Sequence, residues 1–265
     1  MTRLAGQVVW ITGASGGIGE ALARTAATRG AKLILSARRE AELERVRQSL
    51  PRPDDAAILP VDLSALDDAA ALAARAAALF GPIDILVNNA GLSQRTAALD
   101  TAMPAYRHLM EVDFFAPIAL TKALLPGWVA RGRGHAVVVS SVFGHIALAR
   151  RTGYAAAKHA LHGWFDSARI ELGTRGVQFT LACPGFVRTG ISVNALGPGG
   201  VPQGRSDKDI DGGMDPMICA EKIWRAVERD RYEVTIAGIE RLAMWVKRFL
   251  PLRLYTALAR RLKVH

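Results

Sequence analysis

Short apolar segments alternate along this chain with longer helix-prone segments, and this alternation restricts the possible folds more than any other feature. Several of the apolar segments are apolar at every position, which is typical of strands that are buried on both faces of a sheet. Alternating strands and helices of this kind predict a parallel sheet covered by helices. Strands are predicted at residues 8–11, 32–35, 57–61, 83–87, 136–139, 177–181 and 232–236.

The helix-prone segments and the composition complete the fold prediction. Helices are predicted at residues 19–29, 40–50, 65–79, 106–130 and 154–172. Of the 265 residues, 50% are hydrophobic and 22% are charged, which is ordinary for a globular enzyme. We therefore predict an α/β fold: a single Rossmann-like domain over residues 1–240, with a doubly wound parallel sheet of about seven strands and helices on both faces. Residues 241–265 are predicted to form a basic amphipathic C-terminal extension.

The positive charge of the chain is concentrated at its C-terminal end. The formal net charge is +10, but residues 241–265 hold seven Lys or Arg residues and no Asp or Glu, which leaves +3 for the rest. This distribution argues against a nucleic-acid groove, which would spread basic residues across the domain. No secretory signal is recognised, and Cys183 and Cys219 have neither metal-ligand spacing nor a pairing framework. We therefore expect a cytoplasmic protein without a metal centre.

A glycine-rich segment follows the first predicted strand, where a helix is expected to begin. It reads Thr12-Gly13-Ala14-Ser15-Gly16-Gly17-Ile18-Gly19. At such a turn, phosphate groups face backbone N–H groups at the positive end of a helix, and glycines let the backbone approach them closely. The segment therefore predicts a dinucleotide site, and a glycine-rich turn without a ligand is the alternative.

The end of the second predicted strand favours NADP(H) over NAD(H). NAD-selective folds place a carboxylate there, against the ribose hydroxyls. This chain has Ala37 at that position, so no negative charge repels a 2′-phosphate, and Arg38 offers a planar set of donors for it. Alternatively, Arg38 and Arg39 are solvated residues at the start of a helix.

Three residues carry groups suited to proton transfer at a carbonyl oxygen. Tyr154 lies thirteen positions after Ser141, and Lys158 lies about one helical turn after Tyr154. A lysine ammonium favours the tyrosinate form and so makes the tyrosine an effective acid and base. Ser141 follows the fifth predicted strand, where its hydroxyl can hold the substrate oxygen. A Tyr-x-x-x-Lys pair is common by chance, but its combination with Ser141 and the glycine turn is specific.

In these landmarks the chain resembles the short-chain dehydrogenase/reductase family. Further landmarks of that family are Asp62-Leu63, Asn88-Asn89-Ala90-Gly91 and Pro184-Gly185, after the third, fourth and sixth predicted strands. The resemblance covers almost all of residues 7–236. It implies hydride exchange between NADP(H) and a ketone or secondary alcohol, and the family's tetramers suggest a homodimer or homotetramer. The cofactor contacts expected from the turn, the second strand and the resemblance are Gly13, Ser15, Gly17, Ile18, Gly19, Arg38, Arg39, Asp62, Leu63, Asn89, Ala90, Gly91, Tyr154, Lys158, Pro184, Gly185, Val187 and Thr189.

One position departs from the family pattern. The family usually carries asparagine where this chain has Asp113, the fourth member of the catalytic set with Ser141, Tyr154 and Lys158. That asparagine is thought to hold a water that links the active-site lysine to solvent. An ionised Asp113 could accept a hydrogen bond from this water but could not donate one, and its charge would partly offset the effect of Lys158 on Tyr154. We expect catalysis to survive with a shifted pH profile.

Residues 190–215 are predicted to form a substrate lid. The stretch 194–215 is rich in glycine and proline, a composition that is not expected to hold a regular element. Long loops of this kind are usually either functional lids or disordered segments, so disorder without function is the alternative. Apolar residues expected near the cleft favour a hydrophobic substrate, and they are Phe143, Ile146, Leu148, Phe186 and Ile191.

The C-terminal extension contains two apolar helical stripes among its basic residues. The first stripe is Leu242, Trp245, Val246, Phe249 and Leu250, and the second, after Pro251, is Leu254, Tyr255, Leu258 and Leu262. No run here approaches the ~18 uncharged apolar residues of a membrane span. Basic amphipathic helices bind anionic lipid surfaces, so the extension either makes peripheral membrane contact or packs over the cleft or a neighbouring subunit.

A second function class is compatible with the same features. The chain could be a non-catalytic NADP(H)-sensing module that keeps the dinucleotide site and binds a partner or a membrane through its basic tail. Ser141, Tyr154 and Lys158 are all present and favour the enzyme, whereas Asp113 keeps the alternative open.

Overall fold

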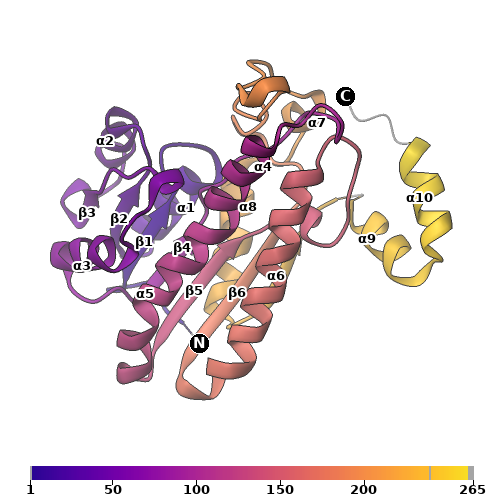
Figure 1. The fold of residues 1–265 in the computed structure, drawn as a ribbon. Coiled ribbons are helices and arrows are strands. Elements are labelled where there is room, and N and C mark those ends of the chain that lie inside the picture. Colours follow the sequence, from indigo (N-terminus) through magenta and orange to yellow (C-terminus); the bar gives the residue numbers. More distant parts are fainter. Residues whose placement is uncertain (1, 239, 262–265) are drawn as a thin grey trace.

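The core of the structure is one sheet whose seven parallel strands lie in the order β3-β2-β1-β4-β5-β6-β7 (Figure 1). The computed structural model describes residues 2–238 and 240–261. The strand order reverses between β1 and β4, as in doubly wound dinucleotide-binding folds, which confirms the predicted fold class. The strands are β1 (Val8–Thr12), β2 (Lys32–Ser36), β3 (Ala56–Ile58), β4 (Ile85–Asn88), β5 (Gly134–Val139), β6 (Val177–Pro184) and β7 (Glu233–Ile236).

The sheet is buried on both faces, as its continuous apolar strands predict. In β1, Ile11 packs into the apolar cluster on one face, and its neighbour Trp10 packs into the cluster on the other. The helices of the first face are α1 (Gly17–Thr28), α2 (Glu40–Gln48) and α8 (Pro216–Glu228), and those of the second are α3 (Ala69–Phe80), α5 (Ala116–Arg131) and α6 (Thr152–Leu172). Only the ends of the strands are left for a ligand, and the loops that follow the strands all meet at one edge.

Two elements have other bounds than the sequence pattern predicted. α3 begins at Ala69 rather than at residue 65, because the Asp68 side chain accepts a hydrogen bond from Ala71 N and caps the helix there. A separate 3-10 turn, Leu63–Ala65, precedes it. β3 ends at Ile58 rather than at residue 61, which we attribute to Pro60, since proline has no N–H to donate to a neighbouring strand.

The helix predicted over residues 106–130 is interrupted. α4 (Met103–Met110) and α5 are joined by a π-helical turn, Glu111–Phe115, which carries Asp113. Such turns are frequent at functional sites. The run Met103–Arg131 is long enough to span a membrane, and an 18-residue window within it has a mean hydropathy of 1.3. This is weak evidence for a span, because buried core helices share these properties and α5 packs against the sheet.

The glycine-rich stretch 194–215 and the C-terminal extension both contain helical elements. The glycine-rich stretch contains a 3-10 turn, Pro198–Gly200, and the short helix α7 (Lys208–Asp211), so the expectation that it holds no regular element is wrong. The C-terminal extension forms α9 (Glu240–Phe249) and α10 (Leu252–Arg261), which project from one side of the molecule (Figure 1). Leu262 and Lys263 lie outside the described residues.

Candidate active site

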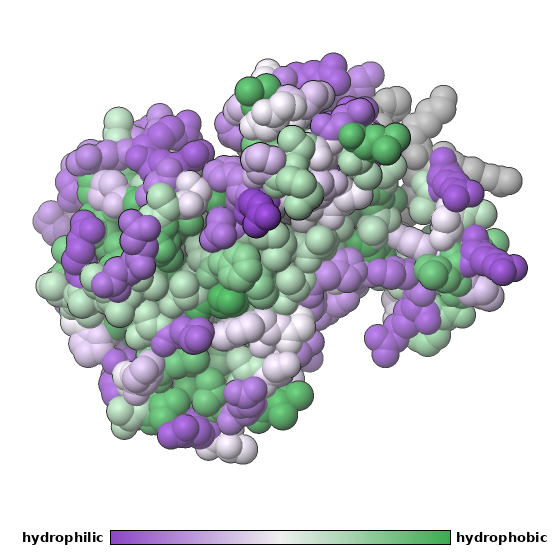
Figure 2. Space-filling model, viewed as in Figure 1, coloured by the Kyte–Doolittle hydropathy of each residue, from purple (hydrophilic) through white to green (hydrophobic). Residues whose placement is uncertain are grey.

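A cavity of about 710 Å³ opens at the carboxyl ends of the strands. The segments that follow β1 to β6 line it, together with residues 190–194 and Ile210 of the predicted lid. Figure 2 shows a hollow at the upper edge of the molecule, between the lid and the part that contains β2 and β3. Its position, on both sides of the reversal in strand order, is where open α/β sheets bind their ligands.

Two glycines of the turn between β1 and α1, Gly13 and Gly19, leave no room for a side chain. A Cβ on Gly13 would lie 2.8 Å from a backbone atom of the segment after β4, and one on Gly19 would lie 2.2 Å from the carbonyl oxygen of Gly13. Gly13 and Gly17 have φ angles of 66° and 56°, which glycine adopts without strain. Asn89 fixes the turn, because its Nδ2 donates to the carbonyl oxygens of Thr12 and Gly13 at 3.0 and 3.2 Å. At Gly13, Gly16 and Gly17 the turn therefore presents backbone to the cavity.

Arg38 and Arg39 line the far end of the cavity, after β2. Both side chains are exposed, and Ala37 lies beside them where a carboxylate would disfavour a phosphate. Asp62, after β3, lines the same end. A hydrogen bond from Ser64 N at 2.9 Å and the positive charge of Arg38 lower the pKa of the Asp62 carboxyl, so this group is ionised at neutral pH.

Ser141, Tyr154 and Lys158 come together in the wall of the cavity, and all three are buried. Ser141 Oγ accepts a hydrogen bond from Phe143 N at 3.2 Å, which holds the hydroxyl at the start of the turn after β5. Lys158 Nζ lies 5.6 Å from the centre of the Tyr154 ring and donates to the Val139 carbonyl at 3.3 Å. The structure therefore brings together a hydroxyl, a phenol and an ammonium from β5 and α6.

Asp113 lies directly behind Lys158 and forms a buried ion pair with it. Its Oδ2 is 3.3 Å from Lys158 Nζ, and its Oδ1 accepts a hydrogen bond from Leu92 N at 2.7 Å. Burial raises the pKa of the Asp113 carboxyl, an effect that Lys158 opposes. Burial alone would lower the pKa of Lys158, but the Asp113 charge holds it above its usual value. The carboxylate thus partly neutralises the ammonium next to Tyr154.

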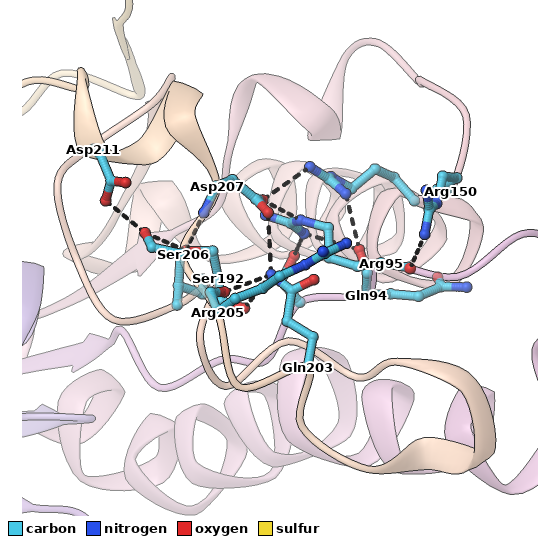
Figure 3. A network of polar contacts seen from close by, with 12 residues as sticks. Gln94, Arg95, Arg150, Ser192, Gln203, Arg205, Ser206, Asp207 and Asp211 are labelled. Carbon is cyan, nitrogen blue, oxygen red and sulfur yellow. Dashed lines mark hydrogen bonds and ion pairs between the residues drawn. The ribbon is translucent and has the colours of Figure 1, made fainter. Parts of the chain in front are cut away.

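Two further arginines close the side of the cavity opposite Arg38. Arg95 and Arg151 line the cavity and are buried, and no local sequence pattern marks them. Oδ2 of Asp207, in the predicted lid, lies 2.5 Å from Arg95 Nε (Figure 3). The same oxygen lies 3.6 Å from Arg151 Nη2. Burial and the charge of Arg95 lower the pKa of Arg151 to about 10. Burial alone would raise the pKa of Asp207, but hydrogen bonds from Arg95 and Gln203 lower it. These charges connect the segment that contains Asp207 to Arg95 and Arg151.

The structure gathers most of the predicted site residues in this one cavity. Gly19 and Asp113 lie behind its wall instead: Gly19 permits close packing of the turn, and Asp113 contacts Lys158. Of the apolar residues expected at the cleft, Ile146 and Leu148 pack in an apolar cluster with Tyr255 and do not line the cavity. The predicted residues that do line it are Gly13, Ser15, Gly17, Ile18, Arg38, Arg39, Asp62, Leu63, Asn89, Ala90, Gly91, Ser141, Phe143, Tyr154, Lys158, Pro184, Gly185, Phe186, Val187, Thr189 and Ile191.

Comparison with known proteins agrees with this geometry. The family model described as short chain dehydrogenase matches residues 7–199. The chain belongs to the short-chain dehydrogenase/reductase family. It is 41% identical over 256 residues to the Dehydrogenase/reductase SDR family protein 7-like of Anopheles gambiae, covering 94% of this chain and 81% of the relative. The protein is therefore a nucleotide-binding oxidoreductase that acts on CH–OH or C=O groups.

Solved structures of the short-chain dehydrogenase/reductase family share the fold along nearly the whole chain. A metagenomic short-chain oxidoreductase in complex with NADP is 30% identical, with a TM-score of 0.71, and the match covers 89% of this chain and 99% of that one. A Burkholderia phymatum short-chain dehydrogenase/reductase in complex with NAD has a TM-score of 0.81 over 100% of this chain and 99% of that one. Because the second is only 22% identical, it bears on the fold alone.

Proposed function

We propose that the protein is an NADP(H)-dependent oxidoreductase that interconverts a hydrophobic ketone and its secondary alcohol. The observation that carries this proposal is the common cavity, which is lined by the glycine turn, Arg38, Ser141, Tyr154 and Lys158. NADP(H), when bound, supplies or accepts the hydride. In the reducing direction, Tyr154 donates a proton to the carbonyl oxygen that Ser141 holds, and Lys158 stabilises the resulting tyrosinate.

The residues of the cavity fit this cofactor. Gly13, Gly16 and Gly17 line the cavity without side chains, so the backbone of the turn is open to the pyrophosphate, and Arg38 suits the 2′-phosphate. Asp62 and Leu63 are assigned to the adenine, Lys158 to the nicotinamide ribose, and the segment 184–189 to the carboxamide.

The cofactor preference is tested by measuring kcat/KM with NADPH and with NADH. We expect a preference for NADPH, and a preference for NADH would refute this part of the proposal. Arg38→Ala should lower kcat/KM for NADPH by roughly 10- to 100-fold and leave the value for NADH almost unchanged, because a hydrogen bond to a charged group contributes about 1.5–3 kcal/mol. Lys222→Ala, at an exposed position in α8, is the matched control and should change neither value.

The substrate class follows from the cavity wall near Tyr154. Phe143, Phe186, Ile191 and Val193 line it and offer an apolar surface. NADPH consumption measured over aliphatic, aromatic, steroid and sugar ketones should show turnover of apolar ketones. Faster turnover of the sugar ketones would contradict the assignment.

We also propose that the C-terminal extension makes peripheral contact with an anionic lipid surface. Its two helices pack on the domain along one side, where the Tyr255 hydroxyl donates to the Ala147 carbonyl at 2.7 Å and Val246 joins the apolar cluster. Trp245 and Phe249 are 62% and 63% exposed, and the Arg248 guanidinium lies 5.9 Å from the centre of the Phe249 ring. Figure 2 shows hydrophobic and hydrophilic residues side by side on this arm. Packing and lipid contact therefore use different faces of the same helices.

Flotation with liposomes tests this contact. The protein should float with phosphatidylserine-containing liposomes and not with neutral ones, because apolar insertion and charge attraction are both needed. Replacing Trp245 and Phe249 together by serine should abolish flotation without affecting ketone reduction. Flotation of this double variant at the level of the unaltered protein would contradict the proposal.

Three further assignments concern the domain bounds, the localisation and the oligomeric state. Residues 1–240 form the catalytic domain, with residues 190–215 as the substrate lid and residues 241–265 as the extension. The protein is cytoplasmic and forms a homodimer or homotetramer, as the family resemblance suggests. Light scattering after size exclusion should give a mass of two or four chains, and a single-chain mass would overturn the last assignment.

A further inference from the structure

Four side chains with metal-binding atoms meet just outside the active-site cavity. His145 follows the turn after β5, His162 lies in α6, Cys183 in β6 and Glu233 at the start of β7. One potential ligand atom from each lies within 4.8 Å of those from the other three. None of the four lines the cavity, and the proposed reaction uses none of them. The cluster therefore calls for a separate explanation.

Several of these atoms lie about as far apart as the ligand atoms around a small tetrahedral ion. His145 Nε2 lies 3.2 Å from Glu233 Oε1 and 3.7 Å from Cys183 Sγ. His162 approaches the same two residues through different nitrogens: Nδ1 lies 3.6 Å from Glu233 Oε2, and Nε2 lies 3.7 Å from Cys183 Sγ. If Nδ1 binds the ion, only the first of these distances is a spacing between ligand atoms. Around tetrahedral zinc, bonds of about 2.0–2.3 Å place neighbouring ligand atoms roughly 3.3–3.8 Å apart. The two His145 distances and the Nδ1 distance of His162 lie close to this range, whereas separations of up to 4.8 Å within the cluster must shorten for all four residues to bind one ion.

The chemistry of the four ligands selects the ion. A thiolate and a carboxylate together neutralise a divalent cation, and two neutral imidazoles add no charge, so the complete site is electrically neutral in its half-buried position. Thiolate and imidazole ligands favour zinc-like ions over Mg²⁺ and Ca²⁺, which prefer oxygen ligands. We propose that His145, His162, Cys183 and Glu233 bind one divalent transition-metal ion of the zinc class.

Ser140 and Gly144, which surround His162, fit the orientation that metal binding requires of its imidazole. Ser140 Oγ lies 3.0 Å from His162 Nε2, so when Nδ1 binds the ion, the Nε2–H can donate to Ser140, an arrangement typical of metal-bound histidine. A Cβ on Gly144 would lie 2.4 Å from His162 Nε2, so glycine there leaves space for the imidazole. The Glu233 side chain is 38% exposed and gives the ion a path from solvent.

Four protein ligands leave no open position, so the site is structural rather than catalytic. The ion would connect the segment after Ser141 to β6, β7 and α6, the part of the sheet edge next to the proposed proton donor (Figure 1). This inference does not depend on the proposed function, because it concerns residues outside the cavity.

Titration of the chelator-treated full chain with Co²⁺ alone tests the proposal. We expect one equivalent to bind with the strong visible absorption of tetrahedral cobalt and a near-ultraviolet thiolate-to-cobalt charge-transfer band. Cys183→Ser should lose the charge-transfer band, whereas Cys219→Ser, which removes the other buried cysteine, should keep it. Zn²⁺ should displace the cobalt and raise the melting temperature of the unaltered protein.

A second test uses His145→Gln. Because His145 is partly exposed, this variant should fold even if the buried core does not tolerate Cys183→Ser. It should weaken Zn²⁺ binding by more than about 100-fold, since loss of even an outer partner of a metal site costs up to that much. The proposal is overturned if the unaltered protein binds no tetrahedral Co²⁺, if a folded Cys183→Ser variant keeps the charge-transfer band, or if His145→Gln binds Zn²⁺ as tightly as the unaltered protein.

Discussion

The two ends of the cavity are built in different ways. At the dinucleotide end, a turn of adjacent residues takes its shape from Gly13 and Gly19, where any side chain would collide with backbone. At the lid end, Arg95 and Asp207 are 112 positions apart and meet only in the folded chain. Local backbone shape makes the first end, and long-range charge pairing makes the second. Substitutions at the two ends should therefore separate dinucleotide binding from lid closure.

The largest effect is expected where the two ends meet, at Tyr154. Tyr154→Phe removes the hydroxyl that transfers the proton but keeps the ring that packs edge-on against Phe143. The kcat for ketone reduction should fall by ~10²–10⁴-fold, the usual contribution of a general acid, whereas the Kd for NADPH should change far less. Steady-state kinetics and fluorescence titration measure the two quantities. A variant with unaltered kcat would remove Tyr154 from the mechanism.

The lid end should respond next most strongly. Asp207→Asn leaves two buried arginines without their shared carboxylate, which should cost about 3–5 kcal/mol of the free energy that holds the lid closed. Hydrogen exchange should show lost protection in residues 190–215 and unchanged protection in β1. Asp209→Asn, at an exposed position in α7, should stay within about 0.5 kcal/mol. Equal lid protection in both variants would mean that the ion pairs do not hold the lid.

The dinucleotide end should show the opposite pattern. Gly19→Ala forces the Gly13 carbonyl to move, and overpacking of this kind costs about 1–3 kcal/mol, so NADPH affinity should fall roughly 10- to 100-fold. Protection of the lid should not change. Gly163→Ala, in α6 with open space around the position, is the matched control and should bind NADPH normally. Unchanged affinity in Gly19→Ala would show that the turn has more room than the contacts indicate.

The smallest effect is expected at Asp113. Asp113→Asn removes the charge that raises the pKa of Lys158 and leaves the ammonium uncompensated beside Tyr154. The ammonium then favours tyrosinate more strongly, so the pH profile of alcohol oxidation should shift to lower pH, with activity retained or raised within about tenfold. A loss of a hundredfold or more, about 2.7 kcal/mol in barrier, would show that the carboxylate has a role of its own.

The parts of the molecule that the sequence predicted are those encoded by short-range patterns. Continuous apolar strands predicted the parallel sheet, and the glycine turn after β1 predicted the end of the cavity that is proposed to hold the dinucleotide. Ser141, Tyr154 and Lys158 were predicted from their spacing, and the structure brings them to one cavity wall. Spacing works here because the end of a strand and one turn of a helix fix where a side chain lies.

The remainder depends on contacts that no local pattern records. Arg95, Arg151 and Asp207 come from three separate segments, as do the four residues of the proposed metal site. The apolar stripes predicted two C-terminal helices but not the face that packs, which is fixed by single contacts such as that of Tyr255 with Ala147. The π-helical turn Glu111–Phe115 was likewise not predicted, and in it Asp113 Oδ2 lies 3.3 Å from Lys158 Nζ.

The central claim is that one cavity holds the dinucleotide and the carbonyl substrate together. It is tested most directly by incubating the protein with NADPH that carries deuterium at both C4 positions and a hydrophobic ketone, and by measuring the mass of the alcohol product. The account predicts one deuterium on the carbinol carbon and an equal amount of NADP⁺. NADPH that binds at the glycine turn but transfers no deuterium to any ketone would contradict it and would favour a dinucleotide-sensing protein without catalytic activity.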